Sequence, residues 1–525
     1  MRFNAKLLNK VRTGVRAVAY GNPVYQKLLT SGEDSAKLRF APPDPWPGNL
    51  VAGLSVINKQ PSLFDLPPNQ PSEITLRNLR EVGTDEARHA ALSLIDEWMS
   101  MHDRWSNDEW SPGLLGARIT AWIGTCAFIA PIATPEFMDR LAASLHRQWK
   151  HLLNTVPPLP SGAKGLAALE AVIYGILNFD RDSKTLANCA EWLDRHLAAE
   201  ILPDGGPIAR NPSEQLHMLE RLLNLRTAYI SANLPPPESI RLAILALTPA
   251  LRLFRHGDGG LALFHGSIEE TPSFIEAVIA QTDTRRRTIC RLPQTGYERL
   301  MAGRSMLIAD GASPPPCSAG SAGHAGLLSF EFSHGRERII TNCGGAEQTE
   351  SKAWRMACAS TAAHSTMTIE DTNACEVQET GGVLNPVRVT SQRYEQNGHQ
   401  CLEMSHEGYL ASFNLTHMRH LTLSGDGESL RGRDSLSGRN GRAFTLRWHL
   451  HPTMQVALTQ GGNSALLRTP SGCGWRLQVD HAQLGLEPGI YCGSGIPRRN
   501  LHLKINGFTS GPETVISWSL SREKK

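Results

Sequence analysis

The chain has 525 residues, with 53 lysine and arginine residues against 50 aspartate and glutamate residues, so its formal charge is +3 when the histidines are neutral. This near balance gives no strong electrostatic indication of a nucleic acid or an anionic membrane as partner. Apolar residues make up 41% and charged residues 20%, which is typical of a folded globular protein. Ten cysteines are too few for a disulfide scaffold, and the length predicts two or more packing units.

The N-terminus is basic. Its charges interrupt every apolar stretch, so no secretory signal is recognised. No window of the sequence reaches the roughly 18 uncharged apolar residues expected of a membrane-spanning helix. Apolar residues at helical spacing beside these charges would allow a weak contact with a membrane surface, and a solvated basic helix is the alternative. We expect a cytoplasmic protein with reduced thiols. The basic residues are Arg2, Lys6, Lys10, Arg12, Arg16 and Lys27.

Residues 76–284 show a helical period. Ala91 and Ile95, for example, belong to a series of apolar residues spaced by three and four positions. Clusters of proline and glycine at 155–162 and 202–207 divide the region into helix pairs. Such pairs can close into an α/α toroid or pack as a plain bundle, and the period alone does not separate the two.

From residue 285 to 525 the period changes to two. Apolar and polar residues alternate in the segments 328–332 and 445–451, and glycine-rich turns such as 425–427 separate the segments. Many short alternating segments predict an antiparallel β-sandwich. Residues 1–75, which lack a clear period, are predicted to form an irregular N-terminal arm.

Three polar residues lie at predicted strand ends in the β half. His324 and His364 each precede a strand, and Asn342 follows one, just before a glycine pair at 344–345. A rigid sheet fixes such residues while the loop leaves room for a ligand. Each histidine alone is better explained as a structural residue. We therefore predict a site only if the three side chains converge.

The helical half offers further candidates. Arg210 and Glu214 flank the start of a predicted helix, and Asn211 between them, followed by proline, has the pattern of a helix cap. Arg210 has no such local role. Arg118 and His256 are the other polar candidates, near turns that also carry tryptophan or aspartate.

Motifs for several large enzyme classes are absent from the sequence. It contains no phosphate-binding loop, no HExxH, no GxSxG and no dinucleotide-binding glycine pattern. The sequence therefore gives no indication of nucleotide-driven chemistry or of α/β-hydrolase chemistry.

Seven segments together resemble the heparinase II/III-like family of bacteria: RITAW, DGGPIARNP, HGDGGLALF, HAGLLSFE, RIITNCG, AAHSTMTI and HEGY. The resemblance extends from about residue 80 to 520. It implies an incomplete α/α toroid followed by an antiparallel β-sandwich, and polysaccharide lyase activity on acidic glycans. In that reaction a uronic acid loses the proton beside its carboxylate and expels the 4-linked sugar oxygen. A cation or amide must stabilise the charge, and a tyrosine or histidine takes the proton.

The resemblance also shows departures. Of the family's paired histidines only the second remains, as His324, while the catalytic tyrosine aligns with Glu214 and an asparagine aligns with Ala167. By resemblance, His324, Asn342 and His364 would hold one structural zinc or other divalent cation, and no other cofactor is implied. Asn342 stands where the family has aspartate, which is a stronger zinc ligand.

Three functions remain open at the sequence level. The first is a divergent lyase in which Tyr409 replaces the missing base. The second is a catalytically degenerate glycan-binding protein, and the third is a hydrolase with paired carboxylates at Asp204 and Glu214. For the lyase we predict catalytic roles for Tyr409, His417, Arg210 and His256, and substrate-binding roles for Arg118, Arg419 and Glu214. The predicted partner is an acidic polysaccharide or oligosaccharide and not a nucleic acid.

Overall fold

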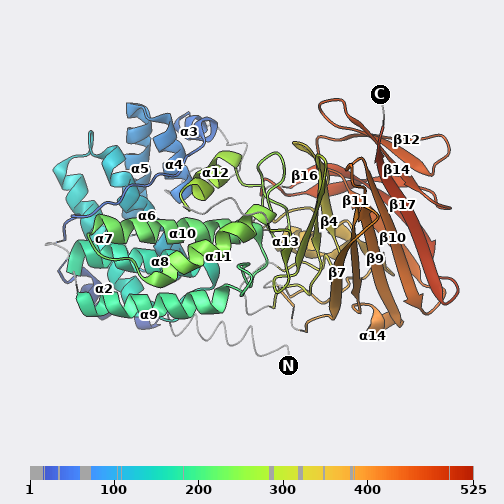
Figure 1. Ribbon diagram of the computed structural model, residues 1–525. Helices are drawn as coiled ribbons and strands as arrows, with labels where there is room; N and C mark the ends of the chain where they lie inside the picture. The colour runs from blue at the N-terminus through green and yellow to red at the C-terminus, as the bar shows by residue number, and fades with distance from the viewer. Residues whose placement is uncertain are drawn as a thin grey trace. The chain divides into compact units, whose positions relative to one another are not determined.

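The computed structural model describes residues 16, 18–32, 36–58, 72–102, 104–107, 109–180, 182–282, 289–316, 323–346, 349, 351–378, 382–383, 385–495 and 497–523. The chain forms two compact units. One comprises Met1–Ala199 and His217–Ile244, and the other comprises Glu200–Leu216 and Leu245–Lys525. The first is helical and the second contains the strands (Figure 1). The start of the sandwich domain at residue 285 stays a prediction from the change of period.

In the part of the helical region that the structure describes, eleven helical segments follow one another in chain order. They are α2 (Pro23–Thr30), α3 (Leu50–Ile57), α4 (Glu73–Val82), α5 (Asp85–His102), α6 (Pro112–Ile129), α7 (Pro135–Thr155), α8 (Gly162–Gly175), the π-helical turn η2 (Ile176–Asp180), α9 (Ser183–Glu200), α10 (Pro212–Ser231) and α11 (Glu238–Leu253). Proline in the first turn and a Ser, Thr or Asn before it start several of them, as in α2, α6 and α7.

Helix α8 lies at the centre of the helical unit, since nearly all of its side chains are buried. It packs on α6, where Gly116 has no side chain to separate the two helices: a Cβ at this position would lie 2.5 Å from the main chain of Ala167. Ala167 therefore serves close helix packing. Helix α6 is also long and apolar enough to cross a membrane, but 61% of its window is buried in the protein, as in any core helix.

The prediction of an irregular arm over residues 1–75 is wrong for two segments. Helices α2 and α3 lie within it, and each begins with a capping asparagine, Asn22 or Asn49, whose side chain accepts a main-chain N–H. Both helices have eight residues. That length is too short for a helical period to stand out in the sequence.

Helix α12 (Pro272–Ala280) precedes the strands, which form three antiparallel sheets among the described residues. The first has the order β1-β2-β3-β4-β5, the second β12-β13-β14-β17-β10-β9-β8-β7 and the third β15-β16-β11-β6. Three short helices, α13 (Lys352–Ala359), η4 (Thr361–Ala363) and α14 (Leu410–Phe413), lie between strands. The strand bounds are β1 Arg291–Leu292, β2 Tyr297–Ala302, β3 Ser305–Asp310, β4 Phe330–His334, β5 Glu337–Ile340, β6 Met367–Ile369, β7 Val389–Gln396, β8 His399–His406, β9 Leu415–Leu423, β10 Ser429–Gly438, β11 Ala443–His449, β12 Gln455–Leu458, β13 Ser464–Arg468, β14 Gly474–Val479, β15 Gly485–Tyr491, β16 Arg498–Phe508 and β17 Glu513–Arg522.

One hydrophobic core joins the three sheets. Strand β9 shows why, because its buried and more exposed residues alternate along its length. The core includes Leu300, Phe332, Leu421, Trp448 and Trp518, which come from all three sheets. Helices followed by an antiparallel β-sandwich confirm the predicted fold class.

Candidate functional site

His324, His364 and Asn342 converge in the interior of the second unit, as the sequence predicts. His324 Nδ1 lies 3.2 Å from His364 Nε2, and His364 Nδ1 lies 3.0 Å from Asn342 Oδ1. None of the three is more than 1% exposed. They come from the segment before β4, the 3-10 turn before β6 and the end of β5, so segments far apart in sequence build one buried centre.

Cys343, which the sequence pattern did not indicate as a site residue, also belongs to this centre. One ligand atom each from His324, Cys343 and His364 lies within 4.8 Å of the others. Asn342 is placed differently from the prediction, because its amide oxygen contacts the nitrogen of His364 that faces away from His324. Successive residues of an extended segment point to opposite sides. The sequence could therefore indicate that either Asn342 or Cys343 faces the histidines, but not which one.

Both histidines are neutral in the folded protein. Burial is the main cause that lowers the pKa of His364 to about 4, and nearby His265 contributes to the same shift. Burial and the neighbouring His364 likewise hold the pKa of His324 well below its usual value. A neutral imidazole offers one lone pair to a partner or a cation.

A buried ion pair continues from this centre. His265 Nδ1 accepts the main-chain N–H of His324 at 3.1 Å, and its Nε2 lies 3.0 Å from Asp310 Oδ2. Arg210 forms an ion pair with Asp310 and donates from Nε to the carbonyl of Thr295 at 2.6 Å. Burial alone would raise the pKa of Asp310, but the Arg210 guanidinium and His265 lower it to about 2. Arg210, predicted to be catalytic, is thus held entirely by internal partners.

His256 is also held by internal hydrogen-bond partners. Its Nε2 lies 2.9 Å from Glu331 Oε2, and its Nδ1 lies 2.8 Å from Ser333 Oγ. The other oxygen of Glu331 accepts the main-chain N–H groups of Leu263 and Asn342. His256 therefore links a turn to the sheet, and its position does not match the predicted proton-transfer role.

A second buried network lies around Asp434 on β10. Its Oδ1 accepts from His417 Nε2 and from Arg419 Nε, each at 2.8 Å, and its Oδ2 accepts from Trp518 Nε1 at 2.9 Å. His417, Arg419 and Asp434 are all 0% exposed. The structure does not place Arg419 or His417 in a groove, which differs from the prediction that they meet the substrate.

Tyr409 is the predicted base, and its surroundings oppose that role. It is 1% exposed and its hydroxyl donates to the carbonyl of Met367 at 2.8 Å. A base requires a lowered phenol pKa, but burial raises the pKa of Tyr409 well above its usual value. His406, whose ring lies 5.4 Å from that of Tyr409, is buried as well.

Tyr409→Phe is expected to leave glycan turnover and binding unchanged and to lower the free energy of unfolding by about 1–2 kcal/mol, because the buried carbonyl of Met367 loses its donor. Thermal unfolding and a glycan assay on the same preparations test this. Loss of an activity present in the unsubstituted protein, with unchanged stability, would restore Tyr409 as a catalytic residue.

The remaining predicted residues also have internal roles. Arg118 lies in the helical unit, with its guanidinium 3.8 Å from the ring centre of Trp98, and burial lowers the pKa of Arg118 to about 10. Glu214 is half-buried in the first turn of α10, where Asn211 caps its N–H as predicted. Asp204 accepts from the N–H groups of residues 294 and 295, each at 2.7 Å. Asp204, proposed for the hydrolase alternative, thus anchors a turn.

An accessible polar cavity of about 430 Å³, which no sequence motif indicated, opens on the eight-stranded sheet. Arg431 and Arg433 project from β10 on either side of Gly432, with His420 of β9 beside them. Trp518 lies beneath, packed so closely on Gly432 that a Cβ there would lie 2.0 Å from the indole. The cavity is lined by His420, Thr422, Arg431, Gly432, Arg433, Asp480, Ser517, Trp518 and Ser519.

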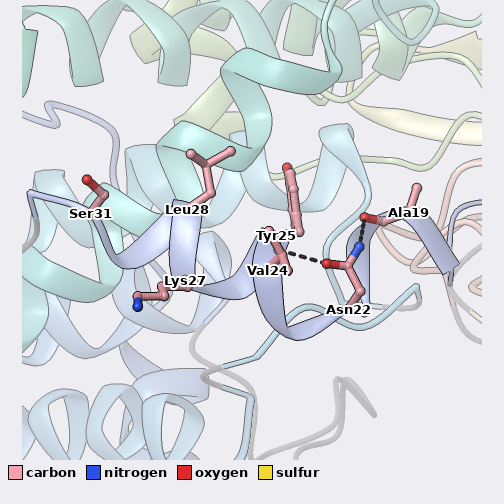
Figure 2. Close-up of a pocket in the computed structure, with 7 residues that line it drawn as sticks. All are labelled: Ala19, Asn22, Val24, Tyr25, Lys27, Leu28 and Ser31. Carbon is pink, nitrogen blue, oxygen red and sulfur yellow. Dashed lines mark hydrogen bonds between the residues drawn. The ribbon is translucent and has the colours of Figure 1, made fainter.

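A second cavity, of about 550 Å³, lies beside α2 in the helical unit. Figure 2 shows Asn22 capping the helix, with its amide oxygen 2.8 Å from the N–H of Tyr25 and its nitrogen 2.7 Å from the carbonyl of Ala19. Val24 and Leu28 on the same helix are 80% and 55% exposed. Together with Lys27 they give α2 an apolar and basic outer surface.

Acid is expected to destabilise both units. Burial lowers the pKa of His151 in the helical unit and of His502 in the sandwich to about 4 each. The unfolded chain protonates these groups near pH 6.5. Between these values the unfolded state binds more protons, so the free energy of unfolding falls by up to about 1 kcal/mol per pH unit and histidine as the pH is lowered. The decline begins near pH 6.5 and is complete near pH 4.

Melting temperatures between pH 7.5 and pH 4.5 measure this effect. His151→Gln should flatten the slope, while the same change at exposed His399 should not. A melting temperature that stays constant from pH 7 to pH 5 would contradict the assignment of neutral buried histidines.

Fold and site define a class of protein with a helical unit, an antiparallel β-sandwich and a buried histidine centre. The family described as heparinase II/III-like, C-terminal, matches residues 284–519. FtsZ-localized protein C of Caulobacter vibrioides is 31% identical over 473 residues, which cover 85% of this chain and 80% of that relative. The chain belongs to the heparinase II/III-like family.

Solved structures agree at the level of the fold. Heparinase III matches with a TM-score of 0.67 and 12% identity, covering 87% of this chain and 79% of its own. A mutant of the heparan sulfate lyase HepC from Pedobacter heparinus matches with a TM-score of 0.61 and 13% identity, covering 98% and 91%. The chain therefore has a polysaccharide lyase-like fold, a helical toroid followed by a β-sandwich.

Proposed function

We propose that this protein is a non-catalytic member of its family that binds an acidic glycan. The observation that carries the proposal is the burial of all four residues predicted to be catalytic. Tyr409, His417, Arg210 and His256 are at most 4% exposed, and each is bonded to internal partners. Proton transfer to a polymer requires a group within hydrogen-bonding distance of the sugar.

The two enzymatic alternatives have weaker support. A lyase would need proton-transfer groups other than those named, since Glu214 and Ala167 replace the family's tyrosine and asparagine. A hydrolase built on Asp204 and Glu214 would need Asp204 to release the main-chain N–H groups that it accepts. A retained fold with altered site residues is the expected outcome when binding persists and chemistry is lost.

The accessible arginine cavity supports an acidic ligand. Arg431 and Arg433 are exposed, and the fork of a guanidinium matches a carboxylate or sulfate in bidentate fashion. Ser517 and Ser519 line the same cavity and offer hydroxyl groups to sugar oxygens. The ring of Tyr394 stacks on that of His420, a residue that lines the cavity, with the ring centres 6.1 Å apart.

Replacing Arg431 and Arg433 together by serine is expected to weaken binding of a glucuronic-acid-containing oligosaccharide at least tenfold, because one lost charged contact exceeds about 1.4 kcal/mol. Calorimetry or fluorescence polarisation measures the affinity. Arg468→Ser, an exposed arginine on β13 of the same sheet, is the matched control and should bind normally. Equal affinities for all three proteins would remove this cavity from the proposal.

We also propose that the protein acts where FtsZ assembles, in the cytoplasm. The support is the relative named FtsZ-localized protein C, which matches most of both chains. A fluorescent fusion of this protein, expressed in its native bacterium, should localise where FtsZ localises. A uniform distribution in dividing cells would contradict this part of the proposal.

A membrane-surface contact through the N-terminus fits the same location. The first 32 residues contain six basic residues and no acidic one, and α2 presents Val24 and Leu28 to solvent beside Lys27. Vesicles with anionic lipids should therefore sediment the protein, while neutral vesicles should not. Val24→Asp with Leu28→Asp should abolish the sedimentation, and its persistence would overturn this contact.

A further inference from the structure

We propose that Cys343, and not Asn342, completes a buried zinc site with His324 and His364. The proposal concerns this chain's own donor atoms, and it does not depend on whether the protein binds a glycan. A thiolate and two imidazoles are ligands that Zn²⁺ prefers. The structure brings one atom of each within 4.8 Å of the others.

The distance between the two histidines supports this assignment. His324 Nδ1 and His364 Nε2 are 3.2 Å apart. Two nitrogens bound to one tetrahedral zinc at about 2.0–2.1 Å lie about 3.3 Å from each other. Nitrogen and sulfur on the same ion lie about 3.6 Å apart. Since the present separation is at most 4.8 Å, the Cys343 sulfur would approach by at most about 1.2 Å.

The orientation of His364 supports it as well. The oxygen of Asn342 accepts a hydrogen bond, so His364 carries its proton on Nδ1 and presents the Nε2 lone pair to His324. An oxygen that accepts the N–H of one ring nitrogen fixes the tautomer in which the other ring nitrogen can bind a metal. Asn342 therefore positions His364 and does not bind the ion itself.

The thiol of Cys343 is buried and lies against two main-chain carbonyls. Cys343 Sγ lies 3.2 Å from the carbonyl of Gly344 and 3.3 Å from that of Cys358. Zinc would replace these contacts with a sulfur–zinc bond, and the thiol proton would pass to solvent. His324 would bind through Nδ1 after the proton that Nδ1 donates to His364 moves to its Nε2.

Cobalt(II) reports directly on a sulfur ligand, because a thiolate bound to cobalt gives a near-ultraviolet charge-transfer band. We expect the full-length protein to bind one equivalent of zinc, measured by elemental analysis, and to show this band after exchange for cobalt. Cys343→Ser should lose the band. Cys343→Asp should lose the band and still bind zinc, which shows that the site remains folded. Asn342→Ala should keep the band with a 10–100-fold weaker affinity.

Two cysteine variants serve as controls. Cys189→Ser removes a buried thiol of the helical unit and should leave the band intact. Cys358→Ser tests the nearest competing thiol, which lies 3.4 Å from the sulfur of Cys492. Any of three results would overturn the proposal. The band survives Cys343→Ser, the band disappears with Cys358→Ser, or the protein binds no zinc.

Discussion

Asp434→Ala is expected to lower the free energy of unfolding by about 3–5 kcal/mol, because it leaves the Arg419 guanidinium buried without a counter-charge. Asp434 and Arg419 are both 0% exposed, and their contact at 2.8 Å is reinforced by His417 and Trp518. Burial alone would raise the pKa of Asp434, but Arg419 holds it far below its usual range. The carboxylate is therefore charged at all ordinary pH values, and its loss removes the centre of the network.

Chemical denaturation followed by tryptophan fluorescence measures this change, because Trp518 reports on the same site. Glu513→Gln is the matched control, since its contact with Arg433 is 3.8 Å long and both side chains are largely exposed. It should change stability by less than about 1 kcal/mol. Equal stabilities for the two variants would mean that Asp434 is not the counter-charge of Arg419.

Arg210→Met is expected to cost a similar amount, about 3–5 kcal/mol, because Asp310 then remains charged in the interior. Arg210 also adopts a left-handed backbone conformation, with φ of 54°, and its side chain donates to three carbonyls, those of Thr295, Ala312 and Ser313. These contacts hold the segment before α10 against the strands. If Arg210 were catalytic, its replacement would instead abolish turnover and leave the stability of the protein unchanged.

Melting temperatures of Arg210→Met and Arg476→Met distinguish these roles. Arg476 pairs with Glu523 at the surface, and its replacement should change stability by less than about 1 kcal/mol. An Arg210→Met protein as stable as the unsubstituted chain would show that the arginine is held for function and not for structure.

The sequence predicts the architecture well because hydrophobic period is a local signal. The change from a period of three to four residues to a period of two separates helices from strands, and the converging residues His324, Asn342 and His364 share strand-end positions that the pattern reveals. Short capped helices such as α2 are missed, because eight residues carry too little periodicity.

Burial of charged residues is the part that the sequence does not predict. Arg210, Arg419 and His417 are residue types that are common in binding grooves. Their acidic partners show that they are internal. Asp310 lies 100 residues from Arg210 in the sequence, and Asp434 lies 15 residues from Arg419. For the same reason, the sequence does not show whether Asn342 or Cys343 faces the histidines. A shift of one residue in register would exchange the two side chains. Both depend on tertiary contacts between distant segments.

The most direct test of the account is incubation of the purified protein with a panel of uronic-acid polysaccharides while the ultraviolet absorbance of the unsaturated sugar and the chain length of the polymer are followed. β-Elimination produces this chromophore, and hydrolysis shortens the chain without it. The account predicts that at least one acidic glycan is bound and recovered at full length, with no rise in absorbance. A steady rise in absorbance that scales with protein concentration would contradict it and establish a lyase.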